Sequence, residues 1–201
     1  MEELSKACVV DQFIPKKKFY EKVNISNSIK EEFTDKLSRI YWRYKISEDT
    51  INISKTENVE EIEVFELELR EKYNSKNILK AITKEIPYPI LFVIKYESDY
   101  QYAIKFEENI YFSEWNNNLE FNFTNLNLEK VYEDIVKVIT NVKDDTKSVK
   151  NELEKKQQIA KIESEIIKLE NQIKKEQQFN KKVELNKKIL IIKQKLEELS
   201  E

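Results

Sequence analysis

Three carboxylates in the first part of the chain have residue types and a spacing that could support metal-dependent chemistry. Glu66 and Glu68 occupy alternate positions of a predicted strand, so both project from one face, and Asp49 lies upstream. Such a group could hold Mg²⁺, which prefers oxygen ligands, and the ion would activate a water molecule. Asp49, Glu66 and Glu68 are therefore the candidate catalytic residues of a Mg²⁺-dependent enzyme.

This arrangement resembles the PD-(D/E)xK pattern of nucleases but departs from it at the cation. Arg70 stands where that pattern has Lys, and a guanidinium stays charged and is a poor proton donor. Alternating acids also fit the solvent face of a half-buried strand, because Phe65, Leu67 and Leu69 occupy the other positions. The nuclease is therefore an alternative, and the sequence favours a protein without catalytic residues, metal or cofactor.

The composition excludes several other kinds of chemistry. The chain of 201 residues contains no His and no Gly, and Cys8 is its only cysteine. Without His there is no Ser-His-Asp or Cys-His nucleophile and no His-containing zinc site. Without Gly there is neither a P-loop nor a GxGxxG nucleotide motif. One cysteine cannot form an intramolecular disulfide.

The sequence also predicts a compartment. The start, Met1-Glu-Glu-Leu-Ser, is acidic and unlike a signal peptide, and the longest apolar stretch, 86–94, is interrupted by prolines and too short to cross a bilayer. A single thiol is typical of a reducing environment. Enrichment in Lys, Ile and Asn is typical of a low-GC bacterial genome. We expect a soluble, cytoplasmic protein without a membrane partner.

Composition divides the chain into two parts, residues 1–142, called the body, and residues 143–201, called the arm. The body contains both Trp and all three Pro, whereas Phe179 is the only aromatic residue of the arm. The arm has 15 Lys against 12 acidic residues, although the whole chain has a net charge of −3. Because the apolar residues of the arm are periodic, we expect it to be folded.

In the body, hydrophobic periodicity predicts an α+β fold, a small and mainly antiparallel sheet flanked by helices. The expected helices are a short one after Pro15, then 28–45 with a capping box from Ser28 to Glu31, 75–84 capped by Ser75, and 127–141 capped by Asn127. The expected strands are 50–54, 61–70 with a bulge near Val64, 87–95, 101–106 and 110–113. Without Gly, the left-handed turn positions must fall to Asn, Asp or Ser.

The arm contains two apolar seams with coiled-coil spacing. The first is Ile159, Ile162, Ile166, Leu169 and Ile173, and the second is Leu185, Ile189, Ile192, Leu196 and Leu199. The spacings mirror each other about Phe179, so a fold-back would bring all five pairs level. We predict an antiparallel helical hairpin of 146–176 and 182–200, turning in 177–180 on a left-handed Asn180. The alternative is one continuous helix that forms a homodimer.

Basic residues surround the predicted turn and make it a candidate binding site. The candidate residues are Lys174, Lys175, Phe179, Asn180, Lys181 and Lys182. A basic tip with an aromatic centre could contact nucleic acid or an acidic surface of a partner protein. The alternative is an ordinary solvated helix end.

Six segments, in order along nearly the whole chain, carry a family resemblance. They are Ile14-Pro-Lys-Lys-Lys-Phe-Tyr, Ile40-Tyr-Trp-Arg-Tyr-Lys-Ile-Ser, Glu61-Ile-Glu-Val-Phe-Glu-Leu-Glu-Leu, Ile86-Pro-Tyr-Pro-Ile-Leu-Phe-Val, Tyr111-Phe-Ser-Glu-Trp and Gln178-Phe-Asn-Lys-Lys-Val-Glu-Leu-Asn. Together they resemble the prokaryotic domain-of-unknown-function family 4391. The resemblance implies no established activity and no catalytic residue. The resemblance implies that the chain is an accessory protein of the kind encoded beside helicases and DNA methyltransferases of restriction-type antiviral gene clusters.

Taken together, these observations favour a non-catalytic interaction subunit. We expect the arm to dock to a larger protein, such as a helicase or DNA methyltransferase of a restriction-type antiviral defence system. The alternatives are the Mg²⁺-dependent nuclease and a nucleic-acid-binding module that uses the basic tip.

Overall fold

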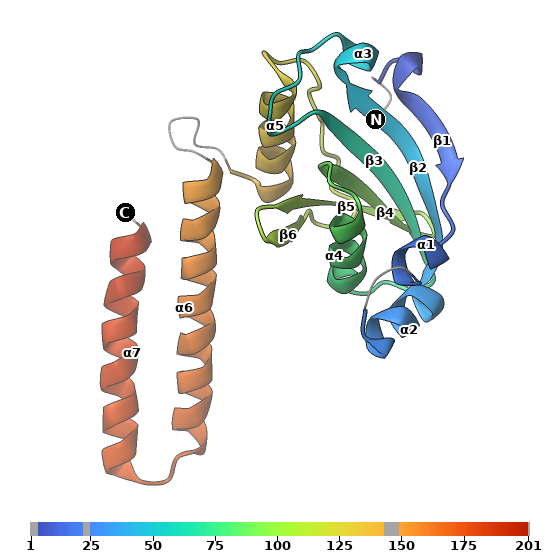
Figure 1. The fold of residues 1–201 in the computed structure, drawn as a ribbon. Helices are drawn as coiled ribbons and strands as arrows, with labels where there is room; N and C mark the ends of the chain where they lie inside the picture. Colours follow the sequence, from blue (N-terminus) through green and yellow to red (C-terminus); the bar gives the residue numbers. More distant parts are fainter. Residues whose placement is uncertain (1–3, 22–24, 143–148, 201) are drawn as a thin grey trace. The chain divides into compact units, whose positions relative to one another are not determined.

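The computed structural model describes residues 4–21, 25–142 and 149–200. It forms two compact units, Met1–Asn141 and Val142–Glu201, for which the names body and arm are kept (Figure 1). The expected start of the arm at residue 143 and of its first helix at residue 146 lie outside the described residues.

The described residues of the body form six strands and several helices. The strands are β1 (Val9–Phe13), β2 (Leu37–Ser47), β3 (Glu61–Leu69), β4 (Ile90–Tyr96), β5 (Asp99–Phe106) and β6 (Asn109–Phe112). The helices are the 3-10 turn η1 (Lys6–Cys8), α1 (Lys17–Tyr20), α2 (Asn27–Asp35), α3 (Glu48–Ile51), α4 (Lys76–Glu85) and α5 (Leu128–Thr140).

One sheet holds all six strands in the order in which they occur in the chain (Figure 1). Each pair of neighbours is antiparallel except β3 and β4, which are parallel and connected through α4. A parallel pair needs such a crossover, whereas antiparallel strands can be joined by tight turns. The predicted α+β class and mainly antiparallel sheet are confirmed.

Strand β3 is buried on both faces. Phe65, Leu67 and Leu69 join a core with residues of α2 and α4. Ile62 and Val64 are also buried, and the period of two directs them to the opposite face, where α5 contacts the sheet. The expectation of a half-buried strand was therefore wrong, because helices cover both sides.

The expected helix 28–45 was correct only in its first half. Helix α2 ends at Asp35, and residues 37–47 form β2. This strand is interrupted by bulges between Leu37 and Arg39 and between Trp42 and Tyr44. A bulge adds one residue to the strand, so Leu37 and Ile40 are both buried at a spacing of three that imitates a helix.

Other local expectations also needed correction. Residues 50–54 are not a strand, because α3 occupies 48–51. The α2 cap is Ser26, whose Oγ accepts a hydrogen bond from the N–H of Ile29 at 3.4 Å, rather than Ser28. Ser75 precedes α4 as expected, but its side chain makes no capping bond. The cap at Asn127 is confirmed, since its Oδ1 accepts from the N–H of Lys130 at 2.9 Å.

Several turns use left-handed backbone in place of glycine. Among the described residues, positive φ values occur at Asp11, Asn52, Glu97, Glu107, Asn116 and Asn141. The expectation that Asn and Asp fill these positions holds for four of the six. The two tight turns of the β4–β5–β6 meander instead use Glu97 and Glu107.

The arm is a helical hairpin of α6 (Val149–Lys175) and α7 (Phe179–Ser200) (Figure 1). All ten residues of the two predicted seams are buried or half-buried. Glu170 of α6 lies 3.7 Å from Lys193 of α7, which also joins the two helices. The antiparallel hairpin is confirmed, and the alternative of one continuous helix was wrong.

Among the described residues, no helix combines the length and the apolar character that a membrane span requires.

Candidate functional site

The six predicted tip residues lie together at the turn of the hairpin. Lys174 and Lys175 end α6, and the other four begin α7. Phe179 is 78% exposed, so it does not pack between the helices to hold the turn. The structure therefore presents an aromatic ring among lysine side chains at one end of the arm.

The turn between α6 and α7 consists of residues 176–178, and a carboxylate holds it. Glu176 Oε1 accepts hydrogen bonds from the N–H groups of Gln177 and Gln178, at 2.8 and 2.9 Å. These backbone hydrogen bonds lower the pKa of Glu176, and the bond from Gln178 has the largest effect. The predicted left-handed Asn180 was wrong, because Asn180 lies inside the first turn of α7.

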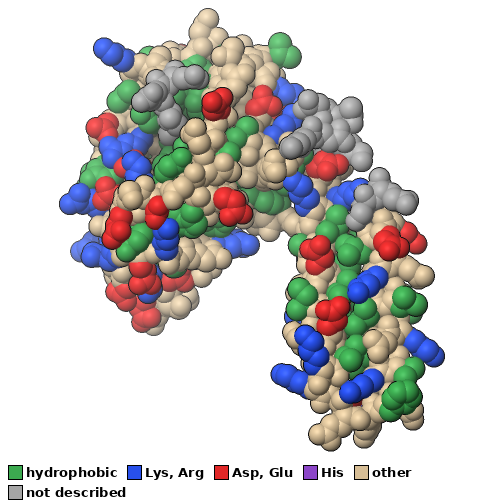
Figure 2. All heavy atoms as spheres, turned by 180° about the vertical axis from the view of Figure 1, so that it is seen from behind, with side chains coloured by type: hydrophobic (Ala, Val, Ile, Leu, Met, Phe, Trp, Pro, Cys, Tyr) green, Lys and Arg blue, Asp and Glu red, His purple; other side chains and the backbone are tan. Residues whose placement is uncertain are grey.

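Several large apolar side chains remain exposed on the arm after its seam is filled. They are Ile167, Phe179, Val183, Leu190 and Ile191, with exposures from 37% to 78%. Phe179, Val183 and Leu190, which we call the outer stripe, recur at steps of four and seven residues and share one face of α7. Figure 2 shows hydrophobic side chains on the surface of the arm among Lys and Glu side chains.

Sequence reasoning used Phe179 but missed Val183 and Leu190. The spacing of Val183 and Leu190 can be read from the sequence, but α7 has two apolar rows. The mirror-image pairing of the seams identified only the row that faces α6. A single helix needs one apolar stripe to pack on its partner. The second row is therefore the signal that could have identified the outer stripe.

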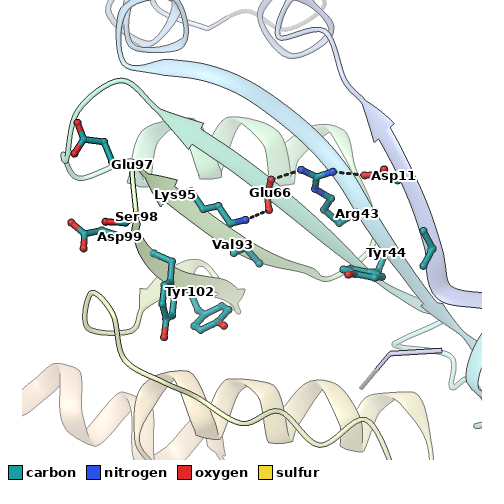
Figure 3. Close-up of a pocket in the computed structure, with 12 residues that line it drawn as sticks. Asp11, Arg43, Tyr44, Glu66, Val93, Lys95, Glu97, Ser98, Asp99 and Tyr102 are labelled. Carbon is teal, nitrogen blue, oxygen red and sulfur yellow. Dashed lines mark hydrogen bonds and ion pairs between the residues drawn. The ribbon is translucent and has the colours of Figure 1, made fainter. Parts of the chain in front are cut away.

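The body has its own hollow, of about 780 Å³, on the sheet surface between β1 and β5. Side chains from four neighbouring strands form a charged row along it, as Figure 3 shows. Glu66 Oε1 lies 2.5 Å from Arg43 Nη2, Glu66 Oε2 lies 2.6 Å from Lys95 Nζ, and Arg43 also pairs with Asp11. Tyrosine side chains border the row on the same surface.

Electrostatics fix the protonation of this row. Glu66 is 7% exposed, and burial alone would raise its pKa. Hydrogen bonds from Arg43 and Lys95 outweigh burial and lower the pKa of Glu66 below its usual value. The carboxylate therefore stays ionised and holds both cations. Because the lining has more acidic than basic residues, the hollow disfavours an anionic ligand.

The three candidate catalytic carboxylates have different surroundings. Asp49 lies in the first turn of α3, and Glu68 Oε2 lies 3.9 Å from Arg39 Nη1 on the exposed part of the sheet. Only Glu66 reaches the hollow. In the part of the chain that the structure describes, no group of three or more Cys, His, Asp or Glu side chains could hold a metal ion. The Mg²⁺-dependent nuclease stays a prediction.

Comparison with known proteins identifies a family. The model of a domain of unknown function, DUF4391, matches residues 4–196. The match spans both the body and the arm, and the chain belongs to this family. No curated protein and no solved structure matches the chain.

Proposed function

We propose that this DUF4391 protein is a non-catalytic interaction subunit that docks to a larger protein through its arm. The observation that carries the proposal is the outer stripe. Phe179, Val183 and Leu190 are exposed although the seam between α6 and α7 is already filled. An apolar row with no partner within its own hairpin is typical of a protein interaction site.

The exposed area is large enough to matter energetically. Burying a side chain such as Leu190 or Phe179 in a partner gains roughly 1.5–3 kcal/mol. Association costs an estimated 4–15 kcal/mol in lost freedom of motion, so several such residues must act together. The outer stripe offers three residues on one helix face.

The charged row of the body supports the non-catalytic part of the proposal. Glu66, the carboxylate that reaches the hollow, is engaged by Arg43 and Lys95. These contacts give the row a structural role, because they connect β2, β3 and β4.

The family resemblance suggests the kind of partner. The resemblance implies an accessory protein encoded beside helicases and DNA methyltransferases of restriction-type gene clusters, so we propose a DNA-processing complex of an antiviral defence system as the partner. This part rests on the resemblance alone.

The test is co-purification from the native host with the protein tagged at its natural abundance. Deleting residues 146–201 should abolish recovery of the partner, while the body keeps the thermal unfolding transition that it shows within the full chain. Unchanged recovery of the partner would contradict the proposal. If the deletion also removes the body's own unfolding transition, the lost recovery reflects a folding defect. A full-length Leu190→Glu variant, which keeps the whole arm, is therefore tested in parallel for recovery of the partner.

A second candidate function is nucleic-acid binding at the tip, which the exposed ring of Phe179 favours. Bases stack on exposed aromatic side chains, and the surrounding lysines would contact phosphates. Binding to single-stranded DNA and RNA should then weaken with salt and fall when Lys174, Lys175, Lys181 and Lys182 are all changed to Glu. Equal weak binding by both proteins would contradict this candidate.

A further inference from the structure

The outer stripe and the seam of α7 face different directions. At 100° per residue, Phe179, Val183 and Leu190 lie roughly 140° around the helix from the seam. Helix α6 covers the seam, as the burial of Ile189 shows, and leaves the outer stripe 37% to 78% exposed. From Phe179 to Leu190 the stripe is about 17 Å long, enough for three turns of a second helix.

The borders of the outer stripe are basic. Residues three or four positions away are its neighbours on a helix surface, and they include Lys182, Lys187 and Lys193. Within α7 no acidic residue occupies such a position. Lys193 also reaches Glu170 of α6 at 3.7 Å, whereas Lys187 lies on the side of the stripe away from the seam.

These charges disfavour a second copy of the chain as the occupant. Two outer stripes packed against each other would bring lysines from both copies to the same borders, in either helix direction. Like charges at such positions destabilise helix pairs, whereas opposite charges along the borders select a partner. The complementary occupant therefore carries apolar residues in its centre and carboxylates on both sides.

We infer that the outer stripe receives an acidic amphipathic helix of the partner protein, which packs on α7 to form a three-helix assembly with α6. The inference rests on the proposed function and names the chemistry of its partner. The partner helix presents apolar residues at three- and four-residue steps against Phe179, Val183 and Leu190. Its Asp or Glu side chains flank that row and pair with Lys182 and Lys187, in the helix-in-groove mode of recognition.

The probe is a labelled 21-residue peptide of three heptads with Leu at positions a and d and Glu at e and g. The matched peptide has Lys in place of each Glu. Binding to the full-length protein is measured by fluorescence anisotropy at about 0.15 M salt. At this salt concentration charges are screened beyond about 8 Å, so the measurement reports mainly short-range charge pairs. We expect the Glu peptide to bind at least tenfold more tightly than the Lys peptide.

Three variants locate the site. Leu190→Glu should weaken binding of the Glu peptide at least tenfold, and Lys182→Glu combined with Lys187→Glu should reverse the preference between the peptides. Ile191→Gln is the control, because Ile191 is 54% exposed on the same helix but lies about 100° from Leu190, and an uncharged side chain does not pair with Lys187 four residues before it. It should bind like wild type, and equal far-UV circular dichroism shows that all variants are folded.

Several results would overturn the inference. They are equal binding of both peptides, no binding of the Glu peptide, or an effect of Ile191→Gln as large as that of Leu190→Glu. A concentration-dependent dimer that Leu190→Glu abolishes would make a second copy the occupant. If the native partner needs the arm but tolerates Leu190→Glu and Lys187→Glu, the proposed function stands and this inference fails.

Discussion

The body and the arm differ in how much of their apolar surface is buried. Helices pack on both faces of the sheet of the body, and residues such as Phe92 and Leu67 are fully buried. Among the described residues, five of the eight exposed large apolar side chains belong to the arm, which is less than a third of the chain. The body thus buries most of its large apolar side chains by itself, whereas the arm has more apolar surface than its hairpin buries.

This contrast separates residues that maintain the fold from residues that are available for binding. In the body most large apolar residues pack in the core, and the buried Glu66 is paired with Arg43 and Lys95. In the arm the seam residues are buried or half-buried, and the outer stripe stays exposed. The following changes test the contrast, beginning with the largest expected effect.

Phe92→Ala should produce the largest loss of stability. Phe92 lies in the middle of β4, is fully buried and contacts Phe65 with ring centroids 6.4 Å apart. Removing a buried ring leaves a cavity and costs about 3–5 kcal/mol. Chemical denaturation followed by tryptophan fluorescence measures it, since both Trp lie in the body. A loss below about 1 kcal/mol would show that the body is not tightly packed.

Arg43→Met should have the next largest effect, because it leaves the buried Glu66 carboxylate with Lys95 alone. Breaking a fully buried ion pair costs about 3–5 kcal/mol, and we expect about 2–3 here because Arg43 is 29% exposed. The control is Arg39→Met, with an expected change below about 1 kcal/mol, because the Arg39 side chain is 59% exposed and its Nη1 lies 3.9 Å from Glu68 Oε2. Equal losses of unfolding free energy in the two variants would contradict the structural role of the row.

Glu63→Gln should change how stability depends on pH. Burial, with the neighbouring Glu61, raises the pKa of Glu63 to about 8, from near 4.5 in an unfolded chain. The folded state then holds a proton that the unfolded state has released, so wild-type stability decreases as pH rises from about 4.5 to 8. Gln cannot ionise, and at pH 8 the variant should be more stable by at least about 1 kcal/mol, the equivalent of one pKa unit.

Thermal unfolding of wild type and Glu63→Gln across this pH range measures the difference. The two curves should converge near pH 4.5, where the Glu63 carboxyl is protonated in the folded body. Curves that remain parallel throughout would contradict the raised pKa.

Leu190→Glu should have the smallest effect on stability. Leu190 is 62% exposed on the outer stripe, and exposed substitutions usually change stability by less than about 0.5 kcal/mol. The same variant is expected to lose the partner, so binding and folding separate at one residue. A large loss of arm helicity in circular dichroism would show instead that Leu190 supports the hairpin.

The features predicted correctly are those encoded locally. The seams of the arm repeat every three or four residues, and their mirror symmetry predicted the hairpin. Asn127 is a local cap, and the strands expected at 87–95 and 101–106 correspond to β4 and β5. Helix 28–45 was wrong in its second half because the bulges of β2 depend on its pairing with β3. A register of this kind is set by the neighbouring strand.

The candidate sites divide in the same way. The basic tip followed from the hairpin, because residues on either side of a turn must meet. The charged row could not be predicted, since Arg43, Glu66 and Lys95 lie 23 and 29 positions apart and meet only through the order of β2, β3 and β4. The spacing of the outer stripe was visible, but its exposure depends on which row of α7 faces α6.

Glu97 and Glu107 hold two tight turns in left-handed backbone that a residue with a Cβ adopts at a cost of roughly 1–2 kcal/mol. Asn tolerates this conformation better, and unlike Gly it does not make the unfolded chain much more flexible. Both turns are therefore positions where one substitution to Asn can add thermostability by lowering the cost of the left-handed backbone. Such a margin would let further mutations accumulate elsewhere, including on the exposed outer stripe of the arm.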